Sequence, residues 1–153
     1  MKFPLFLLAL TLPGAALAQS QVALTSNVLV ERTTTAADGS TRTSLEAPGI
    51  VTPGDRLMFV LAYHNNAASP ATDFVVTNPI PASVGYMGAE SAGSVLSVDG
   101  GRSWGELSAL SVRNADGTSR PATLADVTHV RWHMARPIPA GGSGELRFRG
   151  IVK

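Results

Sequence analysis

The feature that most constrains the fold is a two-residue alternation of apolar and polar side chains that turn residues interrupt at short intervals. Glycine and proline occur 15 and 10 times in 153 residues, and no segment repeats apolar residues at helical spacing over three turns. The clearest alternation spans residues 56–65, whose expected core-facing side chains are Leu57, Phe59, Leu61 and Tyr63. We therefore expect almost no helix and an antiparallel, Ig-like β-sandwich of about seven to nine strands.

The first 18 residues have the order of a secretory signal peptide. Lys2 precedes the apolar run 3–12, and Ala16 and Ala18 are small residues at alternate positions before a cleavage site. The apolar run holds roughly ten residues, which is too short for the ~20 that a membrane-crossing helix needs. We expect cleavage after Ala18, export to the periplasm or cell surface, and no membrane span.

The rest of the chain has a suitable length for one domain. In it, residues 19–49 are expected to form an N-terminal strand and a polar hairpin, and residues 50–153 the Ig-like core. The chain has no cysteine, so it forms no disulfide. The chain has 12 basic and 11 acidic residues, and removal of Lys2 with the signal peptide would make the two numbers equal. A mature chain without net charge gives no support for a nucleic-acid partner.

The N-terminal hairpin is predicted from Asp38-Gly39, a pair typical of tight turns in which both central residues have positive φ. Residues 33–35 are then expected to pair with residues 41–45. The extended piece 19–30 is a candidate for a strand donated to a partner, because open sheet edges of exported sandwiches recruit strands in this way.

The strand expected at residues 56–65 is apolar on both faces, since Met58, Val60 and Ala62 lie opposite the core-facing side chains. Two interpretations stay open. This strand is central and covered by the polar hairpin or a loop, or its second face is a docking surface, because contiguous exposed apolar patches mark partners.

Four segments in order resemble the bacterial conserved-repeat module called domain of unknown function eleven. They are VTPGD at 51–55, LMFVLAYHNN at 57–66, ATDFVVTNPIP at 71–81 and the glycine-rich PAGGSG at 139–144. The resemblance covers residues 50–152. It departs from the family at Asn78, where Asp is common, and at Met58, Val60 and Ala62, where Thr is common. It implies an Ig-like module of exported surface or periplasmic proteins without established catalytic residues.

A second, shorter resemblance is to the Asp-box hairpin, whose pattern fits Ser97, Asp99, Gly101 and Trp104. In such a turn Asp99 caps backbone N–H groups, Gly101 supplies the backbone angles and Trp104 packs back on the hairpin. We predict a structural role. The alternative, a Ca²⁺ site at Asp99, offers one carboxylate where the ion takes about six to eight oxygen ligands.

One expected surface is basic. His129, Arg131 and His133 share one face of a strand, and a later strand carries Arg147 and Arg149. If the two strands are neighbours, these side chains form a positive strip that suits an acidic glycan, a phosphate or an acidic protein patch. The alternative is a solvated face on which the arginines pair with Glu145 or Glu31.

Motifs for catalysis or metal binding are weak. His129 and His133 lie about 13 Å apart on a strand, too far to share one Zn²⁺. Ser103 lies in a Gly-x-Ser-x-Gly sequence at 101–105, but no helical pattern follows it. We therefore predict no catalytic residues, no metal and no cofactor.

The functional prediction is an exported, non-catalytic structural or interaction module of the cell envelope that acts by protein contact or self-association. One alternative is a carbohydrate- or acidic-ligand-binding module that uses the basic strip or an exposed Trp104. A second alternative is a hydrolase whose site the sequence does not reveal.

Overall fold

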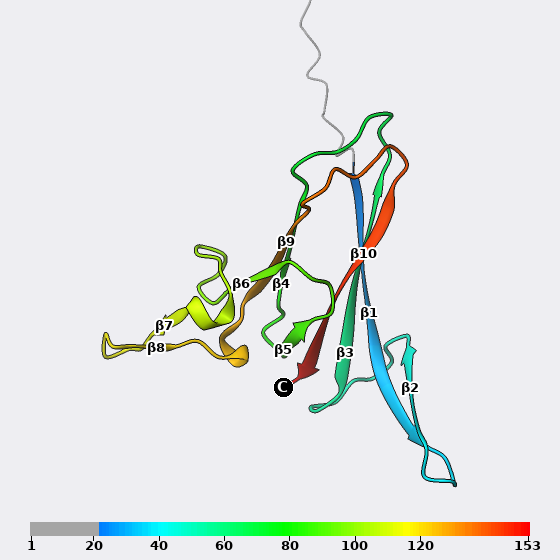
Figure 1. Cartoon of the computed structure of the whole chain (residues 1–153). Coiled ribbons are helices and arrows are strands. Elements are labelled where there is room, and N and C mark those ends of the chain that lie inside the picture. Colours follow the sequence, from blue (N-terminus) through cyan, green and yellow to red (C-terminus); the bar gives the residue numbers. More distant parts are fainter. Residues whose placement is uncertain (1–21) are drawn as a thin grey trace, which may run out of the picture.

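The computed structural model describes residues 22–153, which form ten β-strands and two short 3₁₀ helices (Figure 1). The helices are η1 (Leu107–Ala109) and η2 (Leu124–Asp126). The strands are β1 (Val22–Thr35), β2 (Thr41–Glu46), β3 (Arg56–Asn65), β4 (Val75–Pro79), β5 (Val84–Ala89), β6 (Ser94–Ser97), β7 (Ser111–Arg113), β8 (Ser119–Pro121), β9 (His129–His133) and β10 (Ser143–Val152). The expected signal peptide, residues 1–18, lies outside the described residues.

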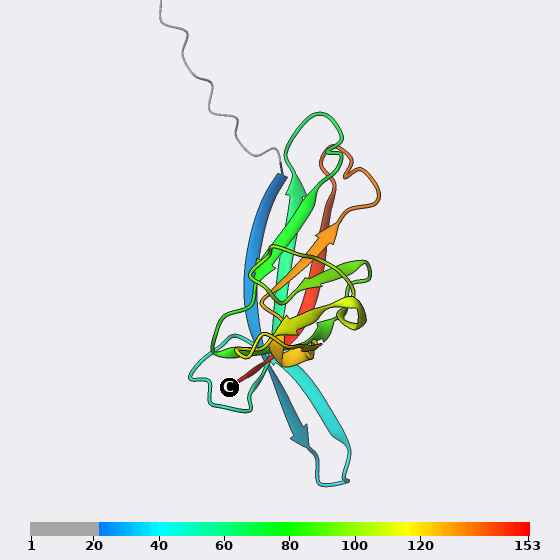
Figure 2. The same cartoon turned by 90° about the vertical axis from the view of Figure 1, so that its left-hand side faces the viewer.

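All strand pairs are antiparallel, and they form three sheets. The larger sheet has the order β2-β1-β3-β10-β5, the smaller sheet the order β4-β9-β6, and β7 pairs with β8 alone. Figure 2 shows the smaller sheet in front of the larger one. The predicted all-β sandwich is confirmed. The strand count exceeds the expected seven to nine, since it includes the short β7–β8 hairpin.

The core lies between the two larger sheets and is centred on Phe148 of β10. Its ring is fully buried and stacks on Phe59 of the neighbouring β3, with 4.5 Å between ring centroids. Trp132 of β9 approaches the same ring from the opposite sheet, at 6.2 Å. The alternation expected over residues 56–65 is therefore confirmed, because Leu57, Phe59 and Leu61 belong to this buried cluster and Tyr63 packs against it.

The hairpin between β1 and β2 has the expected pairing, from Thr35 with Thr41 to Glu31 with Leu45. The expected turn geometry is wrong. Gly39 has φ 82°, but Asp38 is not among the residues with positive φ. The N–H of Ala36 donates to the oxygen of Ser40, so three residues form the loop, and only the glycine needs the left-handed conformation.

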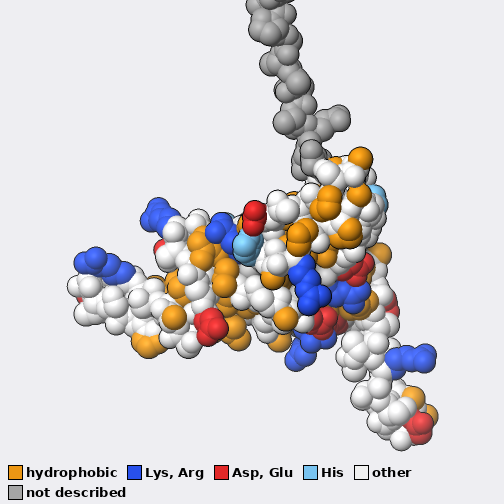
Figure 3. Space-filling view, turned by 45° about the horizontal axis from the view of Figure 1, so that its top comes forward, with side chains coloured by type: hydrophobic (Ala, Val, Ile, Leu, Met, Phe, Trp, Pro, Cys, Tyr) orange, Lys and Arg blue, Asp and Glu red, His pale blue; other side chains and the backbone are white. Residues whose placement is uncertain are grey.

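Two arms extend from the sandwich, and Figures 1 and 3 show both. One is the end of β1 with β2, and the other is the β7–β8 hairpin. The β7–β8 turn repeats the geometry of the first, since the Asn114 N–H donates to the Thr118 oxygen and Gly117 has φ 86°. Side chains on both arms are mostly exposed, so the arms are held chiefly by strand pairing.

Candidate functional site

The most distinctive surface is an unpaired edge of the larger sheet along residues 23–29 of β1. β3 pairs with β1 from Val22 to Glu31, whereas β2 pairs with it only from Val30 to Thr35. Among the described residues, 23–29 therefore have a strand neighbour on one side only. Figure 2 shows this part of β1 along the border of the sheet.

The open edge presents the backbone groups of every second residue. Odd-numbered residues of β3 bond toward β10, as the N–H of Asn65 donates to Gly142. Its even-numbered residues therefore bond toward β1, where they pair with odd-numbered residues. It follows that Leu24, Ser26 and Val28 turn their N–H and C=O groups to the open edge.

The side chains of this edge do not oppose pairing with a further strand. Residues 23–29 contain no charge and no proline, the two kinds of residue by which proteins usually discourage pairing at an edge. The stretch 23–27 is exposed, and Leu24 keeps 47% of its surface accessible. The expectation that residues 19–30 are a donated strand is wrong for the described part, because Val22–Val30 belongs to the chain's own sheet.

The outer face of β3 is not the open apolar patch that Met58, Val60 and Ala62 suggested. Met58 and Val60 are only 2% and 7% exposed, and Ala62 is half-buried. β3 is central, as one interpretation expected. The cover comes from neighbouring strands, whose Leu29 and Arg149 lie beside Met58 in the register.

Arg149 holds this cover in place by ion pairs in two directions. Its Nε lies 2.6 Å from Oε1 of Glu31, and its Nη2 lies 2.7 Å from Oε1 of Glu90. Because β3 separates β10 from β1, the side chain of Arg149 crosses over β3 to reach Glu31. The Glu31 carboxylate, first among several causes, raises the pKa of the Arg149 guanidinium by hydrogen bonding. Arg147 pairs with Glu145 on its own strand at 2.6 Å.

The predicted basic strip does not form. β9 and β10 lie in different sheets, so His129, Arg131 and His133 are separated from Arg147 and Arg149 by the core. Alternation along a strand shows which side chains share a face, but it does not show which strands are neighbours. The alternative expectation, that Arg147 and Arg149 pair with Glu145 and Glu31, is confirmed.

Arg131 instead meets the Asp-box tryptophan on the outer face of the smaller sheet. Its Cζ atom lies 3.6 Å from the ring centroid of Trp104, a cation–π contact, and its Nε donates to Oγ1 of Thr77 at 2.9 Å. The ring of His129 meets Trp104 edge-on at 6.2 Å. No carboxylate of residues 22–153 forms an ion pair with Arg131. The sequence did not predict this contact, because the two residues lie 27 positions apart in separate motifs.

The Asp-box residues form the hairpin as expected. Asp99 accepts bonds from the backbone N–H groups of Arg102 and Ser103, and from the hydroxyls of Ser97 and Ser103. These bonds, with the Ser103 hydroxyl first, hold the pKa of Asp99 well below its usual range. Gly101 has φ 87°, and Trp104 Nε1 donates to its oxygen at 2.9 Å. Asp99 and Ser103 are therefore both used within the turn.

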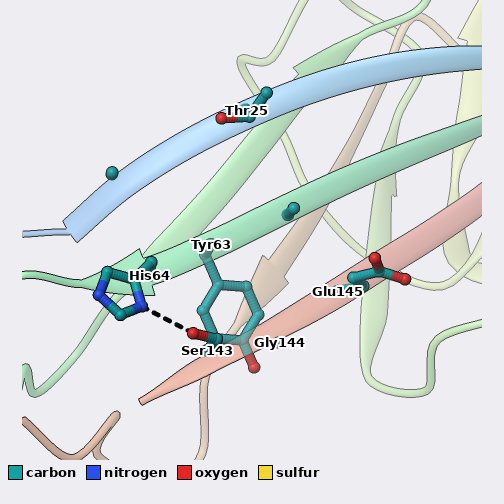
Figure 4. A pocket seen from close by; sticks show the side chains of 8 residues that line it. Thr25, Tyr63, His64, Ser143, Gly144 and Glu145 are labelled. Atoms are coloured by element: carbon teal, nitrogen blue, oxygen red, sulfur yellow. Dashed lines mark hydrogen bonds between the residues drawn. The ribbon is translucent and has the colours of Figure 1, made fainter. Parts of the chain in front are cut away.

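A shallow hollow of about 360 Å³ opens on the outer face of the larger sheet, near one end of β1, β3 and β10 (Figure 4). In it, Nδ1 of His64 lies 2.7 Å from Oγ of Ser143. No sequence pattern pointed to this hollow, because it arises where small side chains of three strands meet. Its lining includes Ala23, Thr25, Ala62, His64, Ser143 and Glu145.

Residues 22–153 contain no group of three or more His, Asp or Glu side chains placed to hold a metal ion. His129 and His133 lie on one strand, as expected, and His133 Nε2 lies 3.9 Å from Asp73 Oδ1. The same residues contain no helix with the length and apolar character needed to cross a membrane.

Comparisons with known proteins give no match to this chain, whether to a family model, to a curated protein or to a solved structure. The resemblance to domain of unknown function eleven therefore remains a prediction from the residues quoted above.

Proposed function

We propose that the protein is an exported, non-catalytic module of the cell envelope that binds other polypeptides through the open edge of β1. The observation that carries this proposal is the uncharged stretch 23–29, which has a strand neighbour on one side only and is exposed along residues 23–27. An edge of this kind is a template for an added strand, whose backbone bonds give affinity while side-chain contacts give specificity. Selection against aggregation would favour a charge or proline here unless the edge has an occupant.

The contacts of the chemically active side chains also favour binding over catalysis. Asp99 and Ser103 bond to each other in a turn, and Arg149 is held by two carboxylates. A catalytic site needs a nucleophile, a base and a group that stabilises developing charge within reach of one substrate atom. The His64–Ser143 pair is the nearest approach to such an arrangement, and it lies in an open hollow.

The proposal is tested by photo-crosslinking in the producing cells. Leu24 is replaced by p-benzoylphenylalanine, and the matched control carries the same amino acid at Ser108, an exposed residue of η1. We expect covalent adducts with polypeptide from position 24 only. Ser26→Lys in the same chain should remove them, because a lysine at the edge opposes strand pairing. Adducts of equal yield from both positions, or none from position 24, would refute the proposal.

Binding of an acidic ligand at Arg131 is a second candidate function, and one specific observation favours it. Arg131 is the guanidinium of the smaller sheet that lacks an acidic partner among the described residues, and Trp104 and Thr77 hold it in place. Such a preorganised guanidinium suits a carboxylate or phosphate. One face of the Trp104 ring is covered by Arg131, so a sugar could not stack on that face.

This candidate is tested with an acidic polysaccharide, polygalacturonate, in an affinity measurement. Arg131→Gln should weaken binding about tenfold or more, since one charge-assisted bidentate pair is lost. Arg147→Gln is the matched control, because its guanidinium already pairs with Glu145 on the opposite outer face. Equal affinities of the two variants would exclude Arg131 as the site.

A further inference from the structure

The open edge has a sequence that is nearly symmetric about Ser26. Residues 23 and 24 are apolar, 25–27 are polar, and 28 and 29 are apolar again. A strand that pairs antiparallel with its own copy meets itself in reverse order, so such symmetry places like opposite like. A general peptide partner would not require this symmetry.

The symmetry agrees with sheet geometry only when the two-fold axis passes through Ser26. Directly opposite side chains must lie on the same face, so residue numbers of a pair must have the same parity. With the axis at Ser26, Leu24 faces Val28, Thr25 faces Asn27 and Ala23 faces Leu29. With the axis at Thr25, Leu24 would face Ser26 and Ala23 would face Asn27, and apolar side chains would oppose polar ones.

The backbone groups of the edge fit the same axis. Leu24, Ser26 and Val28 present their N–H and C=O groups outward, as the register with β3 requires. Ser26 would therefore exchange both of its bonds with Ser26 of the second copy, and Leu24 would exchange both of its bonds with Val28. Every outward backbone group of residues 24, 26 and 28 would then be paired.

The limits of the free edge match the limits of the symmetric stretch. Glu46 of β2 occupies the position beside Val30, so a second copy can pair no further than Leu29. Residues 23–29 contain no charged side chain, so two copies meet without like-charge repulsion.

We propose that two copies of this chain pair antiparallel along residues 23–29, with a two-fold axis at Ser26, and join their larger sheets into one continuous sheet. This inference rests on the proposed binding function of the β1 edge and names its occupant as a second copy of the chain. The contact is isologous, since the same stretch of each protomer contacts its equivalent in the other.

Disulfide trapping tests the axis directly, because the chain has no cysteine of its own. Ser26→Cys in two paired copies would place the Cα atoms about 5.5 Å apart, within the range of a disulfide. Ala23→Cys is the matched control on the same edge, since its copy would lie roughly 20 Å away. Mild oxidation of the exported protein should give covalent dimers from Ser26→Cys and not from Ala23→Cys.

Charged substitutions at the same position test the same two-fold axis without forming a disulfide. Ser26→Lys and Ser26→Glu should each weaken the dimer by at least about tenfold in sedimentation equilibrium, because identical charges meet at the axis. An equimolar mixture should restore the dimer, because lysine then meets glutamate. Circular dichroism of each variant checks that the sandwich is folded.

The outcomes separate this inference from the proposed function. A wild-type monomer over an about hundredfold concentration series overturns the dimer. The proposal is also overturned if mixing Ser26→Lys with Ser26→Glu does not restore the dimer. The same holds if Ala23→Cys gives covalent dimers as readily as Ser26→Cys, because either result requires a different surface or register. If the photoreactive residue at position 24 still captures a different polypeptide, the binding function stands while the self-pairing fails. If it captures nothing, both fail.

Discussion

At the scale of single residues, three aspartates order the tight turns. Asp38, Asp99 and Asp116 each accept bonds from a hydroxyl and a backbone N–H two to four positions later in the chain. These bonds favour the charged form and lower the pKa of all three carboxyls, with the hydroxyl of Ser40, Ser103 or Thr118 as the first cause. These three aspartates therefore stabilise the local backbone structure of their turns.

The Asp99 carboxylate should make the stability of the protein sensitive to acid. Its pKa is lower in the folded chain, so its contribution is complete above the unfolded pKa of about 4 and is lost as the pH falls through the folded pKa. Asp99→Asn should lower the urea midpoint at pH 7 and weaken its fall below pH 4. Asp73→Asn, a change at an exposed carboxyl 3.9 Å from His133, is the control. An unchanged acid response in Asp99→Asn would contradict this assignment.

Phe148 should be the most sensitive core position. Its fully buried ring contacts Phe59, Tyr86 and Trp132, so truncation leaves a cavity that rigid neighbours cannot fill. Phe148→Ala should reduce the free energy of unfolding by about 3–5 kcal/mol, measured by urea denaturation. Leu124→Ala, at a side chain that is 43% exposed, should have much the smaller effect. Similar losses in the two variants would place the centre of the core elsewhere.

At the scale of elements, one side of β1 along residues 23–29 is hydrogen-bonded to β3, whereas the other side has no strand neighbour among the described residues. The amides of Thr25, Asn27 and Leu29 bond toward β3, whereas those of Leu24, Ser26 and Val28 point outward. Residue-resolved hydrogen exchange on the Ser26→Lys variant at low concentration should therefore alternate between slow and fast amides. The same outward amides should become protected in concentrated wild-type protein if copies pair. Uniform protection in the dilute variant would show that another part of the chain covers the edge.

The Arg149 cover on β3 is an element-scale contact that a matched pair of variants can test. Arg149→Ala removes the cation that pairs with Glu31, whose side chain is only 8% exposed. This change should lower the free energy of unfolding by about 1 kcal/mol after allowance for solvent screening. Arg147→Ala leaves the half-exposed Glu145 hydrated and should change stability little. Thermal unfolding measures both, and Arg149→Ala with Glu31→Gln should recover part of the loss. Equal effects of the two single variants would refute the proposed cover.

Elements differ in how well their sequence predicts them. The inward side chains of β3, β9 and β10 follow from alternation, because burial of one face is a local property of a strand. Strand neighbours depend on the whole chain, so the separation of Arg131 from Arg147 could not be read from spacing. The cover of Met58 by Arg149 was missed for the same reason, since it needs β10 beside β3. The Asp-box turn was predictable because the bonds of Asp99 and of the Trp104 indole lie within residues 97–104.

At the scale of the whole molecule, the two outer faces of the sandwich have different electrostatic character. On the larger sheet, Arg147 and Arg149 are neutralised by carboxylates, and the open edge of β1 is uncharged along residues 23–29. On the smaller sheet, Arg131 is held without an acidic partner among the described residues. Figure 3 shows charges of both signs dispersed over the face it presents. A dimer joined at β1 would leave the Arg131 face of each copy accessible, so the two candidate functions are compatible.

We expect removal of the predicted signal peptide to decide when the β1 edge becomes available for pairing. Residues 1–18 directly precede the piece that leads into β1, and cleavage after Ala18 would leave Gln19 to Gln21 before it. In the proposed antiparallel dimer each N-terminus runs toward β2 of the other copy, because Ala23 would lie opposite Leu29 and Glu46 of β2 occupies the next position, beside Val30. A retained apolar leader would crowd that position. Intact-mass analysis of the exported protein should therefore show a chain that begins at Gln19. Ala18→Phe should block cleavage and reduce dimer formation together. A processed chain that is monomeric, or an unprocessed one that dimerises equally well, would break this link.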